Sequence, residues 1–226
     1  MAKQIKHISH KLIDTLSDGV FSIALTLLGL DVVGLVHKIS ESKDFNVTMF
    51  ENLPTFLAYV LGFIVLFSWW YQYHVTSQYV VGTNAMIVWN HGMTMAWVAL
   101  MPFGVALLAE NLSTHNMKWG VFYFGICLFG QYWTGFIQRF VLTIFRGDTT
   151  ITWTEDFFLT DMSKEDQNKA LLMFLGFPGA LGVVLVSICL LSPWIALAGY
   201  TVYIFTSLNP VKSLNSLLPT FAKLLK

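Results

Sequence analysis

The chain has 226 residues, of which 55% are hydrophobic and only 12% are charged, and its formal net charge is zero. Soluble domains carry about 25% charged residues, so this composition argues against a soluble domain and indicates an integral protein of the lipid bilayer. The balanced charge also gives no electrostatic basis for binding nucleic acid.

The apolar residues are grouped into segments that favour membrane-spanning helices, which need about 20 residues to cross a bilayer. We expect an all-α membrane protein with six transmembrane helices per subunit, forming a single domain over residues 1–226. A short basic segment, 1–11, precedes the helices, and an amphipathic tail, 211–226, follows them. The expected helices cover residues 12–36, 53–79, 85–108, 120–145, 169–191 and 194–208.

Two details of these segments carry further expectations. Residues 38–51 are predicted to form a polar connection between the first two helices. Pro102 lies late in the third helix, where it is expected to kink that helix or to end its regular part, because proline lacks the backbone N–H.

The distribution of basic residues predicts the orientation of the chain in the membrane. Six spans place both termini on one side of the bilayer. If that side is the cytoplasm, the outer loops hold only Lys38, Lys43 and Lys118 of the thirteen lysines and arginines. We therefore expect a multi-pass protein of the cell membrane with cytoplasmic N- and C-termini, and with residues 147–168 in the cytoplasm.

Asp18 is the most informative polar residue, because it lies inside the first apolar helix. A charge at the centre of such a helix costs at least about 2.5–3.5 kcal/mol, so even near the cytoplasmic end Asp18 needs polar partners. The topology brings the end of the second helix and the start of the third to the same depth. We predict a structural network that ties the three helices together. Its expected members are Ser17, Asp18, Trp70, His74 and Asn90.

Catalytic and metal-binding interpretations of these residues are weaker. Ser17, His74 and Asp18 are the residue types of a hydrolase triad, but adjacent residues point about 100° apart on a helix, and no nucleophile-elbow pattern surrounds the serine. A metal site formed by His74, His91 and Asp18 is similarly disfavoured. We therefore predict no enzymatic activity, no metal and no cofactor.

A second face of the first helix is purely aliphatic. With Ile23 placed at zero on a helical wheel, Leu27 falls at about +40° and Leu30 at about −20°, while Asp18 falls at about −140°. This stripe therefore lies roughly opposite the aspartate. Its periodicity allows it to face lipid, another subunit, or a pore axis around which several copies assemble.

Three motifs occur in order along the first half of the chain. Residues 17–27, in the first helix, read Ser-Asp-Gly-Val-Phe-Ser-Ile-Ala-Leu-Thr-Leu. The second helix carries Trp70-x-x-Tyr73-His74. The third helix carries Trp89-Asn90, followed by Leu100-Met101-Pro102-Phe103.

Together these motifs resemble the transmembrane-protein-175 family of potassium channels, over roughly residues 12–103. The family's first helix reads Arg-x-x-x-Phe-Ser-Asp-Gly-Val-Phe-Ala-Ile-Ala-x-Thr-Leu, its second helix has Trp-x-x-His-His, and its third has Leu-Asn followed by Leu-Pro-Phe. This chain departs from the pattern at Leu12, which replaces the arginine, at Leu16, which replaces the phenylalanine, and at Tyr73, which replaces the first histidine.

The resemblance implies a single six-helix repeat that assembles as a homotetramer, with the first helix lining a central pore. By position, Ile23, Leu27 and Leu30 would form the pore constriction, a hydrophobic gate that dewets when closed, with Thr26 as a possible polar layer. The implied function is passive permeation of potassium and other monovalent cations. Two alternatives remain open: a proton-coupled ion transporter that uses Asp18 and His74, and a non-conducting membrane scaffold.

Overall fold

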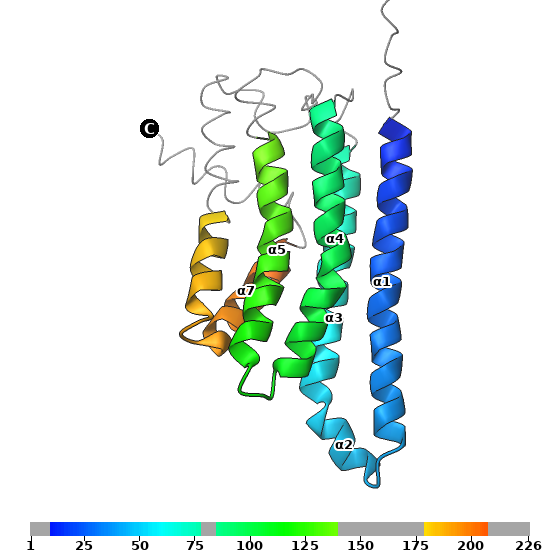
Figure 1. Cartoon of the computed structure of the whole chain (residues 1–226), viewed down its shortest axis with the longest axis vertical. Helices are drawn as coiled ribbons and strands as arrows, with labels where there is room; N and C mark the ends of the chain where they lie inside the picture. The colour runs from blue at the N-terminus through cyan, green and yellow to red at the C-terminus, as the bar shows by residue number, and fades with distance from the viewer. Residues whose placement is uncertain (1–9, 78–84, 140–178, 208–226) are drawn as a thin grey trace, which may run out of the picture.

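The computed structural model describes residues 10–77, 85–139 and 179–207, and all regular secondary structure in these residues is helical (Figure 1). The all-helical prediction is therefore confirmed. The basic N-terminal segment up to residue 9, the 147–168 segment and the 211–226 tail lie outside the described residues. The helices are α1 (His10–Ser40), α2 (Phe45–Glu51), α3 (Leu53–Ser77), α4 (Ala85–Asn111), α5 (Met117–Arg139), a short helix at Gly179–Ile188, and α7 (Pro193–Ser207).

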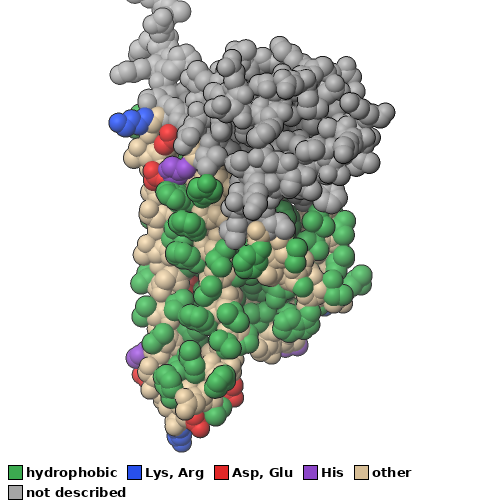
Figure 2. All heavy atoms as spheres, turned by 180° about the vertical axis from the view of Figure 1, so that it is seen from behind, with side chains coloured by type: hydrophobic (Ala, Val, Ile, Leu, Met, Phe, Trp, Pro, Cys, Tyr) green, Lys and Arg blue, Asp and Glu red, His purple; other side chains and the backbone are tan. Residues whose placement is uncertain are grey.

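Within the described residues, three helical stretches are long and apolar enough to cross a membrane: Lys11–Ser40, Leu53–His74 and Val88–Asn111. These belong to α1, α3 and α4. On the face seen in Figure 2, hydrophobic side chains cover the middle of the described body, and the charged side chains gather towards its two ends. This distribution is typical of a body whose middle lies in lipid. The chain is thus a helical membrane protein.

The helix boundaries differ from the expected ones by a few residues at several ends, and two expectations about the connections and Pro102 need correction. The prediction of a polar connection over 38–51 is wrong at its end, because α2 forms at Phe45–Glu51. The side chain of Asp44 caps this helix by accepting a hydrogen bond from the backbone N–H of Val47 at 3.1 Å, which is the usual way an aspartate starts a helix. In addition, α4 continues through Pro102 to Asn111, so the regular part of the helix does not end at Pro102, and a kink there stays a prediction.

Helix α1 packs against α3 and α4 through one face. Phe21, Ala24 and Leu28 are 1–2% exposed and belong to the main hydrophobic core. They lie at i, i+3 and i+7, so they share one side of the helix. The core residues that they join include Val65 and Leu66 of α3. This packing fixes the rotation of α1 and so decides which of its residues face outwards.

The partner of α4 on its other side is α5, and small residues let the two helices approach closely. At Gly130, an added Cβ atom would lie 2.6 Å from the indole ring of Trp97, so only glycine fits there. The same indole donates a hydrogen bond from its Nε1 to the hydroxyl of Thr134 at 2.9 Å. Small residues and interhelical hydrogen bonds of this kind hold membrane helices together where burial from water contributes little.

Candidate functional site

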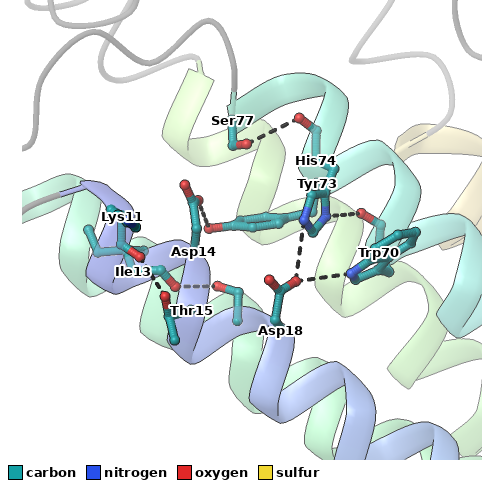
Figure 3. Close-up of polar contacts among 10 residues, drawn as sticks. Lys11, Ile13, Asp14, Thr15, Asp18, Trp70, Tyr73, His74 and Ser77 are labelled. Carbon is teal, nitrogen blue, oxygen red and sulfur yellow. Dashed lines mark hydrogen bonds and ion pairs between the residues drawn. The ribbon is translucent and has the colours of Figure 1, made fainter.

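The carboxylate of Asp18 lies where the end of α3 meets the first turns of α1 (Figure 3). Its Oδ1 accepts a hydrogen bond from the indole Nε1 of Trp70 at 3.1 Å, and the Nε2 of His74 lies 3.3 Å from the same oxygen. The Asp18 side chain remains half exposed, and that of His74 is 36% exposed. The structure therefore brings together three of the predicted network residues, and it joins α1 to α3 through them.

The two ring nitrogens of His74 both face acceptors. Nδ1 lies 3.1 Å from the backbone carbonyl oxygen of Trp70, one turn earlier, and Nε2 faces Asp18. A carbonyl oxygen can only accept, and so can an ionised carboxylate. Both contacts are satisfied when the imidazole carries a proton on each nitrogen, or when the proton lies on Asp18. The geometry thus accommodates one proton shared within this pair.

Tyr73 supplies a second link between α1 and α3 that the sequence reasoning missed. Its hydroxyl donates a hydrogen bond to Oδ1 of Asp14 at 3.0 Å, one turn before Asp18. The Tyr73 ring is buried and meets the His91 ring of α4 edge-on, with 5.5 Å between the centroids. The spacing of Asp14 and Asp18 on one helix face was a usable signal, because residues four apart lie one above the other.

The other predicted site residues have different surroundings. Ser17 is 1% exposed, and its hydroxyl donates to the carbonyl of Ile13 at 2.9 Å within α1. Thr26 is exposed, and its hydroxyl donates to the carbonyl of Ser22 at 2.7 Å. Asn90 lies on α4 next to His91, and its backbone carbonyl accepts a bond from Thr94 at 3.1 Å. A bond between Asn90 and Asp18 stays a prediction.

The aliphatic stripe of α1 points away from this network. Ile23 is 64% exposed, Leu27 is 45% exposed and Leu30 is 61% exposed in the single chain. Leu28, which neighbours Leu27, is only 2% exposed. The helix therefore has one face that is buried in its own subunit and another that this subunit leaves uncovered. Among the described residues, no group of three or more His, Cys, Asp and Glu side chains is placed to hold a metal ion.

A solved structure has a similar fold. The crystal structure of a lysosomal potassium-selective channel TMEM175 homologue from Chamaesiphon minutus matches 88% of this chain and 95% of its own, with a TM-score of 0.70 and 21% identity. This match defines the class: the chain has the helical fold of that membrane channel.

The sequence matches each cover less than half of the chain. A model of the family described as endosomal/lysosomal potassium channel TMEM175 matches residues 12–102. A potassium channel of Chamaesiphon minutus is 37% identical over 101 residues, and one of Streptomyces collinus is 32% identical over 100 residues; each match covers 44% of this chain. The matched part spans 49% and 48% of those two proteins, about half of each.

The resemblance seen in the sequence motifs is therefore confirmed. Residues 12–102 match the model of the TMEM175 family, and these residues form most of α1, all of α2 and α3, and most of α4. They contain the contacts of Asp18 and the exposed stripe of the same helix.

Proposed function

We propose that this chain is the subunit of a passive potassium-permeable cation channel that assembles as a homotetramer, with α1 lining the pore. The observation that carries the proposal is the uncovered aliphatic face of α1. Ile23, Leu27 and Leu30 remain largely exposed while the opposite face of the helix is buried. The potassium channels that are similar to about 44% of this chain support the choice of permeant ion.

The polar contacts of α1 would hold this helix in one orientation, as the wall of a pore requires. Asp18 and Asp14 tie the start of α1 to Trp70, His74 and Tyr73 of α3. A helix held on one side in this way presents its other side in a fixed rotation. Four copies of α1 arranged about an axis would then bring four equivalent aliphatic stripes together.

Rings of aliphatic side chains can close a channel by expelling water from a narrow passage. Ile23, Leu27 and Leu30 would form these rings, spaced by about one helical turn each. Thr26, which is exposed near them and whose hydroxyl donates to the carbonyl of Ser22, would add a polar layer to the wall. Because the chain has no Thr-Val-Gly-Tyr-Gly carbonyl filter, we expect moderate discrimination between monovalent cations and not a near-absolute preference for potassium.

Potassium flux into liposomes tests the assignment of the pore face. Replacing Ile23 with asparagine should wet the constriction, and we expect potassium leak to rise or selectivity over sodium to fall by about tenfold. Ile195→Asn in α7 is the matched control, because Ile195 is 62% exposed in the same chain and lies outside α1. This control should leave flux and selectivity unchanged.

Two results would contradict the proposed pore face. If Ile23→Asn, Leu27→Asn and Leu30→Asn all leave flux unchanged, the stripe faces lipid. If Ile195→Asn changes flux as strongly as Ile23→Asn, the effect reflects polarity in the membrane and not a pore. Crosslinking of the reconstituted protein would establish whether the conducting species is a tetramer.

A proton-coupled ion transporter is the second candidate, favoured by the geometry of His74. At this end of the helix bundle, Nε2 of His74 and Oδ1 of Asp18 lie close enough for one proton to be bound between them. Collapse of the proton gradient with a protonophore distinguishes the two functions. A passive channel continues to conduct potassium down its gradient, whereas a coupled transporter stops concentrating it. If the protein is monomeric and conducts no ions in the same liposomes, the third interpretation, a non-conducting membrane scaffold, is favoured.

We also propose the expected orientation, with six spans and with both termini in the cytoplasm of a bacterial-type cell membrane. In this orientation the Asp18 network lies near the inner surface. The connection that contains α2 lies outside.

A further inference from the structure

A pocket lies at the end of the helix bundle opposite to the Asp18 network, between α1, α3 and α4. It has a volume of about 430 Å³. Its lining residues come from α1, from the end of α2 and the start of α3, and from the end of α4 and the loop after it: Leu30, Asp31, Gly34, Leu35, Lys38, Glu51, Asn52, Thr55, Tyr59, Ala109, Glu110 and Ser113. This is the end that carries α2 in Figure 1. The volume falls in the range of small-molecule sites, about 300–1,000 Å³.

The charge of the pocket is strongly unbalanced. Asp31, Glu51 and Glu110 line it, and Lys38 is the cationic residue among its lining residues. The lysine Nζ lies 3.5 Å from the side-chain oxygen of Asn52, which is a neutral acceptor. Within the part of the chain that the structure describes, none of the three carboxylates forms an ion pair. The pocket therefore attracts cations.

Tyr59 is the second feature that points to a ligand. Its side chain is only 6% exposed, and it lines the pocket from α3. Among the described residues, its hydroxyl has no hydrogen-bond partner. The hydroxyl itself is not enclosed among the described residues, so it reaches the space of the pocket and is free to bond to a molecule there. A ligand in the pocket can supply that partner, and the aromatic ring can also stabilise a cation.

The distribution of these groups selects the kind of cation. A bare metal ion needs several ligands that converge on one point, and no described cluster of His, Cys, Asp and Glu does so. Three separated carboxylates around a volume of about 430 Å³ match a larger ligand whose positive charges are also separated. Linear polyamines have this character, since their ammonium groups are spaced along a flexible chain and each can donate hydrogen bonds.

We propose that this pocket binds a linear polyamine, whose ammonium groups pair with Asp31, Glu51 and Glu110 while one of them donates to the hydroxyl of Tyr59. The binding itself does not depend on the proposed pore. Because Leu30 belongs both to the pocket and to the exposed stripe of α1, a bound polyamine would lie beside the pore mouth. That consequence alone rests on the proposed function.

Calorimetric titration of the full chain in an uncharged detergent tests the proposal, with spermidine as the probe. Wild-type protein should bind spermidine saturably, and more tightly than it binds butylamine. The double variant Asp31→Asn with Glu110→Gln should weaken binding about tenfold or more, since two charge pairs are lost. Tyr59→Phe, which retains the ring, should weaken binding about threefold through loss of the hydroxyl.

Glu41→Gln is the matched control, because Glu41 is an exposed carboxylate at the same end of α1 but is paired with His37 and does not line the pocket. It should bind spermidine as the wild type does. The proposal is overturned if wild-type protein shows no saturable binding, if Glu41→Gln weakens binding as much as Glu110→Gln, or if Mg²⁺ displaces spermidine at equal concentration. Glu110 is itself exposed, so the single Glu110→Gln variant tests the site even if the double variant does not fold.

Discussion

The two faces of α1 differ in what covers them. The inner face is apolar at Phe21, Ala24 and Leu28, which α3 and α4 bury almost completely. The outer face is equally aliphatic at Ile23 and Leu27, yet this subunit leaves those side chains exposed. Hydrophobicity alone therefore does not distinguish the two faces. The inward face is the one whose side chains fit the core of α3 and α4, and the contacts of Asp14 and Asp18 with α3, here called the anchor, hold the start of α1 in the same rotation. The comparison predicts that similar substitutions have opposite consequences on the two faces.

Leu27 and Leu28 offer the sharpest test and the largest expected effect. They are adjacent leucines, 45% and 2% exposed. Leu28→Asn should destabilise the subunit by about 3–5 kcal/mol, because it loses core packing and buries an amide without a partner. Leu27→Asn should leave the subunit folded and change ion flux instead. Thermal unfolding in detergent, together with flux in liposomes, separates the two outcomes. Equal loss of folded protein in both variants would contradict the two-face description.

Removing the anchor should have the next largest effect. Asp18→Ala leaves the Trp70 indole and the His74 imidazole without their acceptor, and we expect a loss of about 2 kcal/mol. Asp18→Asn is the control, since its amide oxygen can still accept from Trp70. It should retain part of the lost stability. Thermal unfolding of the purified variants measures both. If Asp18→Ala is as stable as the wild type, the pair does not hold α1 in place.

Much of this arrangement follows from the sequence by simple geometry. Alternating helices bring the end of one and the start of the next to the same depth, which placed Trp70 and His74 near Asp18. A rotation of about 100° per residue separated the aspartate from Ile23. Geometry left open whether lipid, another subunit or a pore faces the exposed stripe, and only the resemblance of the motifs to potassium channels favoured a pore.

Other features depend on local or tertiary detail that the pattern does not carry. Helix α2 forms inside a segment of mixed polarity, and its signal is the single capping residue Asp44. The bond from Tyr73 to Asp14 lies at a position where this chain departs from the family motif, so the motif gave no signal for it. The pocket around Tyr59 needs three helices in their final positions.

Tyr73→Phe should have the smallest of these effects. The substitution removes the bond to Asp14 but keeps the buried ring, so we expect a loss of about 1 kcal/mol in stability. Tyr71→Phe is a matched control, because Tyr71 lies two residues away and is 47% exposed. It should melt at the wild-type temperature. Equal melting temperatures for both variants would mean that Asp14 contributes nothing to the anchor.

Chemical modification of a single pore-face cysteine tests the central claim most directly. Leu27→Cys would place a thiol on the exposed face of α1, whereas the native Cys127 and Cys189 are buried. A positively charged, membrane-impermeant thiol reagent should stop potassium flux through Leu27→Cys liposomes while leaving the wild type and Val202→Cys, whose side chain is 64% exposed on α7, unaffected. Undiminished flux after complete modification of Leu27→Cys would contradict the assignment of this face to a pore.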